Sequence, residues 1–112
     1  MADLTLTVYD VGRTTAAGAN FTDNLTAATN ADNVYFANDG RVLLVVQSGG
    51  GGNVTVTTPN TVDALAITDL VIAAAAGDLQ IHGPFPPSIY NDANGKVKVV
   101  VSANTNVMAI RV

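Results

Sequence analysis

Apolar and polar residues alternate along much of this chain with a period of two, the pattern of β-strands that bury one face. The alternation is clear over residues 4–8, 54–57 and 79–82. Residues 41–46 form an apolar run after their initial arginine, as expected for a central strand that is buried on both faces. Residues 96–101 and 106–112 complete the set of clear strand patterns.

Turn-forming residues separate these segments. Asn38-Asp39-Gly40 and residues 91–95 supply side chains that accept left-handed backbone angles. The glycine tract at 48–52 is expected to join two strands as a hairpin, and residues 70–73 are expected to form a strand before a turn at Gly77-Asp78. The pattern predicts an all-β fold of about seven or eight short strands: a small antiparallel β-sandwich or a jelly-roll-like β-barrel.

The length of 112 residues fits one domain, which we assign to residues 1–112. Residues 12–32 are expected to form a long loop, or an arm that becomes ordered on a partner, because only Phe21 and Leu25 offer substantial apolar anchors there. The N-terminal segment is a second candidate for ordering on a partner. Residues 64–67 are short and ambiguous.

Charged residues make up only 12% of the chain, the net charge is −4, and every acidic residue is Asp. A surface with so few charges favours association, so we expect a homo-oligomer or a permanent partner. A monomer with an Ala- and Thr-rich surface is the alternative. Of the five basic residues, only Lys96 and Lys98 share a strand face, which is too few for nucleic-acid binding.

The chain contains no cysteine, which excludes disulfides, thiolate metal sites and a catalytic thiol. The N-terminal residues lack the features of a signal peptide, and no apolar stretch approaches the ~18 residues that cross a bilayer. We therefore expect a protein that folds in the cytoplasm where it is made and has no membrane partner.

Residues with catalytic or metal-binding chemistry do not form a recognisable set. His82 is the only histidine, and no motif pairs it with a nucleophile, so a surface or strand-end position is the simpler interpretation. Asp92-Ala93-Asn94-Gly95 is similar to part of a calcium loop, but no carboxylate side chain follows it, and turn formation explains it better. We predict no catalytic residue, no cofactor and no metal.

Residues 83–90 are the most suggestive segment for binding. Three prolines restrict their backbone, while Phe85, Ile89 and Tyr90 offer apolar contact area. The segment is either an interaction edge or a crossover between sheets whose aromatic side chains fill the core.

Several of these runs together resemble the small head decoration (capsid cement) proteins of tailed phages. The runs are residues 36–46 with the glycine tract and 54–57, then 83–91, 95–99 and 109–112, and the resemblance covers roughly residues 34–112. It implies a non-enzymatic virion protein on the capsid exterior that binds the mature shell and bridges subunits of the major capsid protein. It also implies a homo-oligomer, with a trimer favoured.

Two segments are our candidates for capsid or subunit contacts. The first would add as an edge strand to a capsid strand and comprises Ala2, Asp3, Leu4, Thr5 and Leu6. The second comprises Phe85, Pro86, Pro87, Ile89 and Tyr90. A carbohydrate-binding or adhesion module of a phage tail or cell surface is the main alternative, although the absence of Trp disfavours it; a small hydrolase using His82 has the least support.

Overall fold

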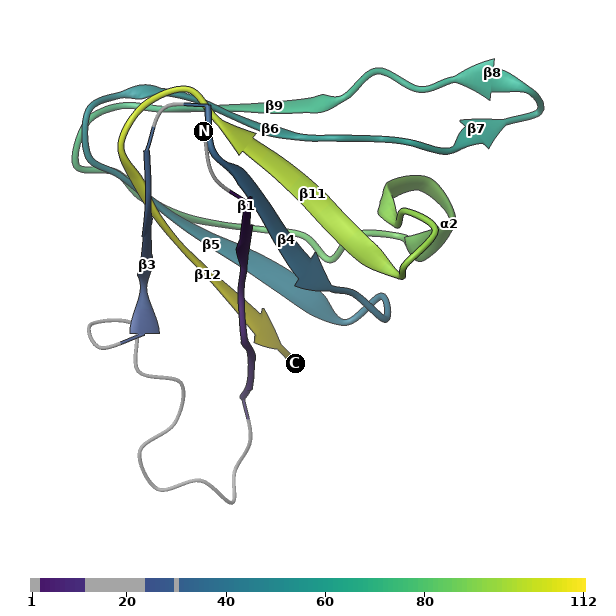
Figure 1. Cartoon of the computed structure of the whole chain (residues 1–112), viewed down its shortest axis with the longest axis horizontal. Coiled ribbons are helices and arrows are strands. Elements are labelled where there is room, and N and C mark those ends of the chain that lie inside the picture. Colours follow the sequence, from purple (N-terminus) through teal and green to yellow (C-terminus); the bar gives the residue numbers. More distant parts are fainter. Residues whose placement is uncertain (1–2, 12–23, 30) are drawn as a thin grey trace.

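The computed structural model describes residues 3–11, 24–29 and 31–112, which form two packed β-sheets (Figure 1). The predicted all-β sandwich is confirmed, and within these residues neither sheet closes into a barrel. The long axis of the molecule measures 45 Å and the short axis 22 Å. A short helix, α2 (Pro87–Tyr90), lies beside the sandwich.

Each sheet has five strands. The first sheet contains, in spatial order, β1 (Asp3–Thr5), β4 (Asn33–Ala37), β11 (Lys96–Val101), β6 (Gly52–Val56) and β9 (Leu70–Ala74). The second sheet contains β10 (Leu79–His82), β5 (Val42–Ser48), β12 (Thr105–Arg111) and β2 (Val8–Asp10), and β3 (Thr26–Ala28) pairs with the other half of β12. A separate ribbon consists of β7 (Thr61–Val62) and β8 (Leu65–Ala66).

The expectation of a purely antiparallel sandwich is wrong at both N-terminal strands. β1 pairs in parallel with β4, and β2 pairs in parallel with β12. The single strand predicted over residues 4–8 is therefore two strands in different sheets. The chain crosses between the sheets at Leu6, whose side chain is buried in the core, and the apolar alternation continues through the crossing because both sheets face that core.

The glycine tract does not join a hairpin, contrary to prediction. β5 pairs with β10 and β12, whereas β6 pairs with β11 and β9, so the tract carries the chain from one sheet to the other. The physical reason lies in β5 itself, because a strand that is apolar on both faces needs a central place between two neighbours. Gly52, with a φ of 136°, has the backbone freedom that this change of sheet uses.

The structure has more strands than the sequence pattern predicted. The additional strands β3, β7 and β8 are two or three residues long, too short to show a period. β3 lies within the predicted long loop at 12–32, so this part of the segment forms a strand rather than a loop. Residues 12–23 and 30 of that segment lie outside the described residues, so its ordering on a partner stays a prediction.

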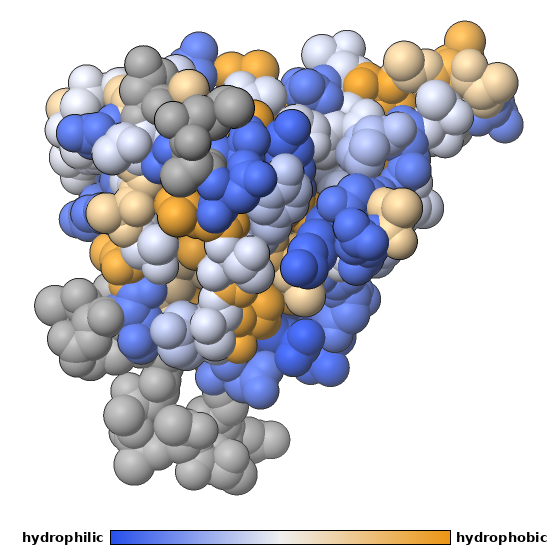
Figure 2. All heavy atoms as spheres, in the orientation of Figure 1, coloured by the Kyte–Doolittle hydropathy of each residue, from blue (hydrophilic) through white to orange (hydrophobic). Residues whose placement is uncertain are grey.

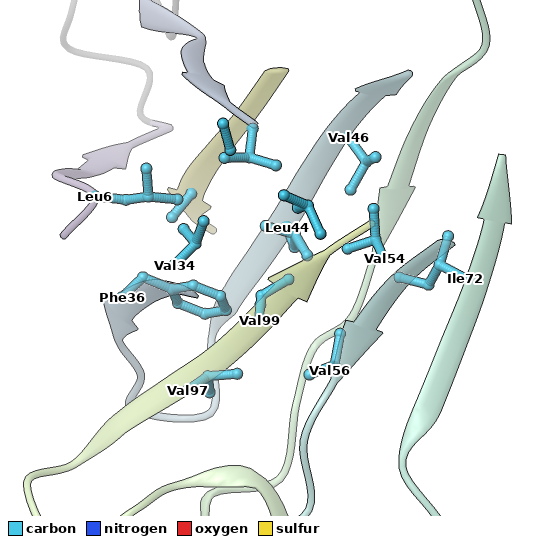
Figure 3. Packing of buried hydrophobic residues seen from close by; sticks show 14 of the residues in the cluster. Leu6, Val34, Phe36, Leu44, Val46, Val54, Val56, Ile72, Val97 and Val99 are labelled. Atoms are coloured by element: carbon cyan, nitrogen blue, oxygen red, sulfur yellow. The ribbon is translucent and has the colours of Figure 1, made fainter. Parts of the chain in front are cut away.

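The core lies between the facing sheets and consists mainly of valine side chains (Figure 3). In β11, residues 97, 99 and 101 point inward, as the alternation predicts. Phe36 of β4 and Leu44 of β5 are the largest fully buried apolar side chains at the centre of this cluster. A second, smaller cluster covers the outer face of the second sheet and contains Val45, Met108 and Ile110, with Tyr9, Leu25 and Leu43 packed against it.

Truncation of Leu44 tests this core. Leu44→Ala should destabilise the protein by about 2–5 kcal/mol, because it removes buried methyl groups and leaves a cavity. Leu79→Ala is the matched control, since Leu79 is 52% exposed and should change stability by about 0.5 kcal/mol at most. Urea unfolding followed by circular dichroism measures both. Equal losses in the two variants would contradict the assignment of the core.

Candidate functional site

The most distinctive surface feature is a hairpin that projects from the sandwich, here called the arm (residues 57–69). It continues the β6–β9 pair beyond the body and ends in the β7–β8 ribbon at one end of the long axis (Figure 1). Asp63 and Ala64 at its tip have φ values of 51° and 63°, as a two-residue type I′ hairpin turn requires. The arm is therefore a defined β-hairpin rather than an irregular loop.

One polar contact holds the two sides of the arm together where the backbone ladder is interrupted. The backbone N–H and the hydroxyl of Thr58 both donate to Oδ1 of Asp69, at 2.8 and 2.9 Å. The same hydroxyl also contacts the carbonyl oxygen of Ile67. This contact joins the two sides of the arm at its base.

The end of the arm is apolar and exposed. Leu65 is 70% exposed, the highest value among the large hydrophobic side chains of the described residues. Ile67, two residues further on, is partly exposed, and Figure 2 shows hydrophobic residues gathered on the arm. Exposed apolar side chains on a projecting element are typical of an interaction site.

A second exposed apolar site lies on β10, the edge strand of the second sheet. Leu79 and Ile81 are each 52% exposed. Ile81 pairs with Val45, which in turn pairs with Met108, so this edge continues the outer apolar cluster of the sheet. Where β10 begins, Gly77 and Asp78 together oppose Ser48: Gly77 donates to the carbonyl of Ser48, and the N–H of Ser48 donates to Asp78. Gly77 has a φ of 88°, so this is a glycine β-bulge.

The N-terminal candidate segment is partly committed to the core. Leu6 is buried, and Leu4 packs against the same cluster. Asp3 accepts a hydrogen bond from the side-chain amide of Asn33, at 3.0 Å. Asp3 and Thr5 are exposed on an edge strand, so they are the residues of this segment available to a partner. Ala2 lies outside the described residues.

The second candidate segment fills the open end of the sandwich. This is one of the two alternatives that the sequence offers for residues 83–90, the other being an interaction edge. Phe85 is 2% exposed, and its ring centroid lies 6.1 Å from that of Phe36 and 5.2 Å from that of Tyr90. Ile89 and Tyr90 are partly buried, while Pro86 and Pro87 are exposed. Phe85 therefore serves the core, and the predicted contact role stays a prediction for the exposed prolines.

Three asparagines fasten this segment to the sandwich, and the sequence analysis missed them. The side-chain amide of Asn38 donates to the carbonyl of Phe85 at 2.9 Å and to Oδ1 of Asn91 at 2.8 Å. Asn91 donates back to the carbonyl of Asn38, and Asn60 donates to the carbonyl of Asn91. Because Asn60 belongs to the arm, the network also connects the arm to α2. Asn38 is buried, whereas its position directly before Asp39-Gly40 predicts an ordinary turn residue.

Polar side chains border a shallow hollow of about 370 Å³ on the outer face of the first sheet. Its lining residues are Asp3, Thr5, Tyr35, Asp92, Asn94 and Lys96. Lys96 and Lys98 share this outer face, as predicted, because the alternate residues of β11 point inward. Asp92 is a turn residue: its Oδ1 accepts the N–H groups of Asn94 and Lys96, at 2.8 and 3.1 Å.

The candidate catalytic and metal-binding residues are dispersed. Nε2 of His82 lies 2.8 Å from Oε1 of Gln80 on the same strand. Among the described residues, no group of three or more His, Asp or Glu side chains is placed to hold a metal ion. None of the described helices is long and apolar enough to span a membrane.

No family model, curated protein or solved structure matches this chain.

The asparagine network makes a testable contribution to order at α2. Asn38→Ala leaves the carbonyl of Phe85 without this donor, and each buried polar group that loses its partner costs about 1–3 kcal/mol. The amides of Tyr90 and Asn91, which bond to Pro86 and Pro87, should exchange with solvent faster than in the parent protein. Hydrogen exchange by NMR measures this. The exposed Asn94→Ala variant should leave these rates unchanged, and an identical response of both variants would contradict the assigned role.

Proposed function

We propose that this chain is a non-enzymatic structural protein of a tailed-phage virion, which binds the outside of the mature capsid and bridges neighbouring capsid subunits. The resemblance of residues 34–112 to phage decoration proteins suggests this function. The observation that carries it in the structure is the free edge of β1. Among the described residues β1 pairs only with β4, so its other side is open to a strand of another protein.

Backbone geometry shows which groups this edge offers. The N–H of Leu6 donates to the carbonyl of Tyr35 on β4, at 2.8 Å. Successive N–H groups of a strand point to opposite sides, so the N–H of Thr5 points away from β4. Addition of a capsid strand along this side would satisfy these groups through main-chain hydrogen bonds, as in other cases of strand addition.

A bound decoration protein would stabilise the capsid by mass action. A ligand that binds the intact shell and not its ruptured form shifts the equilibrium toward the intact shell. Modest free energy from each of many copies would then oppose internal DNA pressure. The exposed apolar side chains of β10 and of the arm also suit binding, and they support the expected homo-oligomer.

Binding to capsids is the direct test. Purified protein is mixed with expanded, undecorated heads assembled from the major capsid protein of the same phage. We expect saturable binding measured by sedimentation, density at threefold or quasi-threefold positions in electron cryomicroscopy, and heads that survive a higher temperature. No binding of folded protein to expanded heads would refute the proposal. A specific hit on a glycan array would then favour an adhesion module.

The β1 edge gives a sharper prediction. Thr5→Pro removes an edge N–H that β4 does not use, and proline is tolerated on such an edge. We expect the variant to remain folded and to bind heads at least 10-fold more weakly, because one main-chain hydrogen bond is lost and the proline ring obstructs the added strand. Thr5→Ala keeps the N–H and should bind like the parent. Equal affinity of both variants would show that capsids do not add a strand to β1.

A further inference from the structure

Two strands that belong to different sheets, β8 and β10, have unused edges and apolar residues with the same spacing. Within the described residues β8 pairs only with β7, and β10 pairs only with β5. Leu65 lies in β8 and Ile67 directly follows its end, while Leu79 and Ile81 lie on one side of β10. Both pairs are two residues apart, so the two segments place their apolar side chains on the same face when they lie side by side.

The backbone of β10 is open at the positions that carry these apolar side chains. Ser48 donates to the carbonyl of Asp78, so Asp78 faces β5. By strand alternation Gln80 and His82 also face β5, and the N–H and C=O groups of Leu79 and Ile81 face the free edge. The edge therefore offers both hydrogen-bonding groups and apolar side chains to an added strand.

Neither segment has the usual protection against pairing. Sheet edges are commonly protected by charged side chains, by proline or by a covering element. Residues 79–82 contain no Lys, Arg, Asp, Glu or proline, and neither do residues 64–67. Carboxylates lie only beyond the ends of the two segments, at Asp63, Asp69 and Asp78, so the residues that would pair carry no like charges themselves.

We propose that the arm of one copy adds as a strand to the β10 edge of a second copy and extends its second sheet. Leu65 and Ile67 would then pack beside Leu79 and Ile81, on the same face of the sheet as the outer cluster formed by Val45, Met108 and Ile110. The arm extends to one end of the long axis (Figure 1), and β10 belongs to the sandwich body. The contact is therefore heterologous, and it closes into a ring when the rotation between copies permits.

The size of the contact predicts its strength. A standard interface uses roughly 20–30 residues on each side, and the arm with the β10 strand provides fewer than that. We therefore expect reversible, concentration-dependent association in solution. Each copy gives one arm and receives another, so a closed ring is more stable than a single contact. This inference does not depend on binding to a capsid.

Thiol cross-linking of the protein alone tests the contact, because the chain has no native cysteine. Leu65→Cys protein is mixed with Ile81→Cys protein and treated with a short bifunctional thiol reagent. We expect at least a fivefold higher yield of cross-linked dimer than from Ile81→Cys mixed with Val112→Cys. Val112 is the matched control, since its side chain is 50% exposed and lies on neither proposed surface. All three positions are exposed, and circular dichroism confirms folding.

Each outcome decides the proposal. Equal yields in the two mixtures would refute it, and so would a dominant self-linked product of Ile81→Cys, which would indicate edge-to-edge pairing of two β10 strands. In support, Leu65→Asp should lower the mean mass measured by sedimentation at high protein concentration, while Val112→Asp should not. Because these assays contain no capsids, their failure would leave the Thr5→Pro test of capsid binding unaffected.

Discussion

The pairing between β5 and β12 is the interaction on which the rest of the structure depends. These two strands match over seven consecutive residue pairs, from Thr105–Ser48 to Arg111–Val42. Their inner faces supply Leu44, Val46 and Val107 to the main core, and their outer faces supply Val45 and Met108 to the second cluster. β12 also carries β2 and β3, which divide its other edge between them. Without this pair, neither the second sheet nor either apolar cluster would form.

Strand positions could be predicted from the sequence, whereas the assignment of strands to sheets could not. The period of two in β11 identifies the buried valines, because alternation depends only on which face meets the core. The same pattern continues through Leu6 although the chain changes sheets there. Alternation contains no information about the partner strand, so the glycine tract was mistaken for a hairpin loop. The arm could not be predicted for another reason. Its strands are too short to show a period, and Leu65 is exposed, so it does not belong to a buried face that alternation would indicate.

The two candidate segments show that an apolar side chain selected from the sequence for binding can instead serve the core. Phe85 and Leu6 were selected from the sequence as binding residues, and both are buried in the core. Their neighbours Pro86 and Thr5 remain exposed, so a partner that contacts these two segments would meet backbone edges and small side chains rather than a large aromatic anchor. Main-chain recognition of this kind depends on the register and curvature of the sheet, which the rigid valine core fixes.

The divided edge of β12 has a consequence for the order of assembly. β2 and β3 precede β12 by about eighty to a hundred residues, and within the described part of the chain they pair with no other strand. During synthesis these early segments leave the ribosome long before their partner exists. The second sheet therefore closes only when β12 has emerged, and its long sequence separation from β2 is typical of slow-folding β-proteins. Until then one edge of β5 stays unpaired, and the outer apolar cluster, to which β12 contributes Met108 and Ile110, has not yet formed.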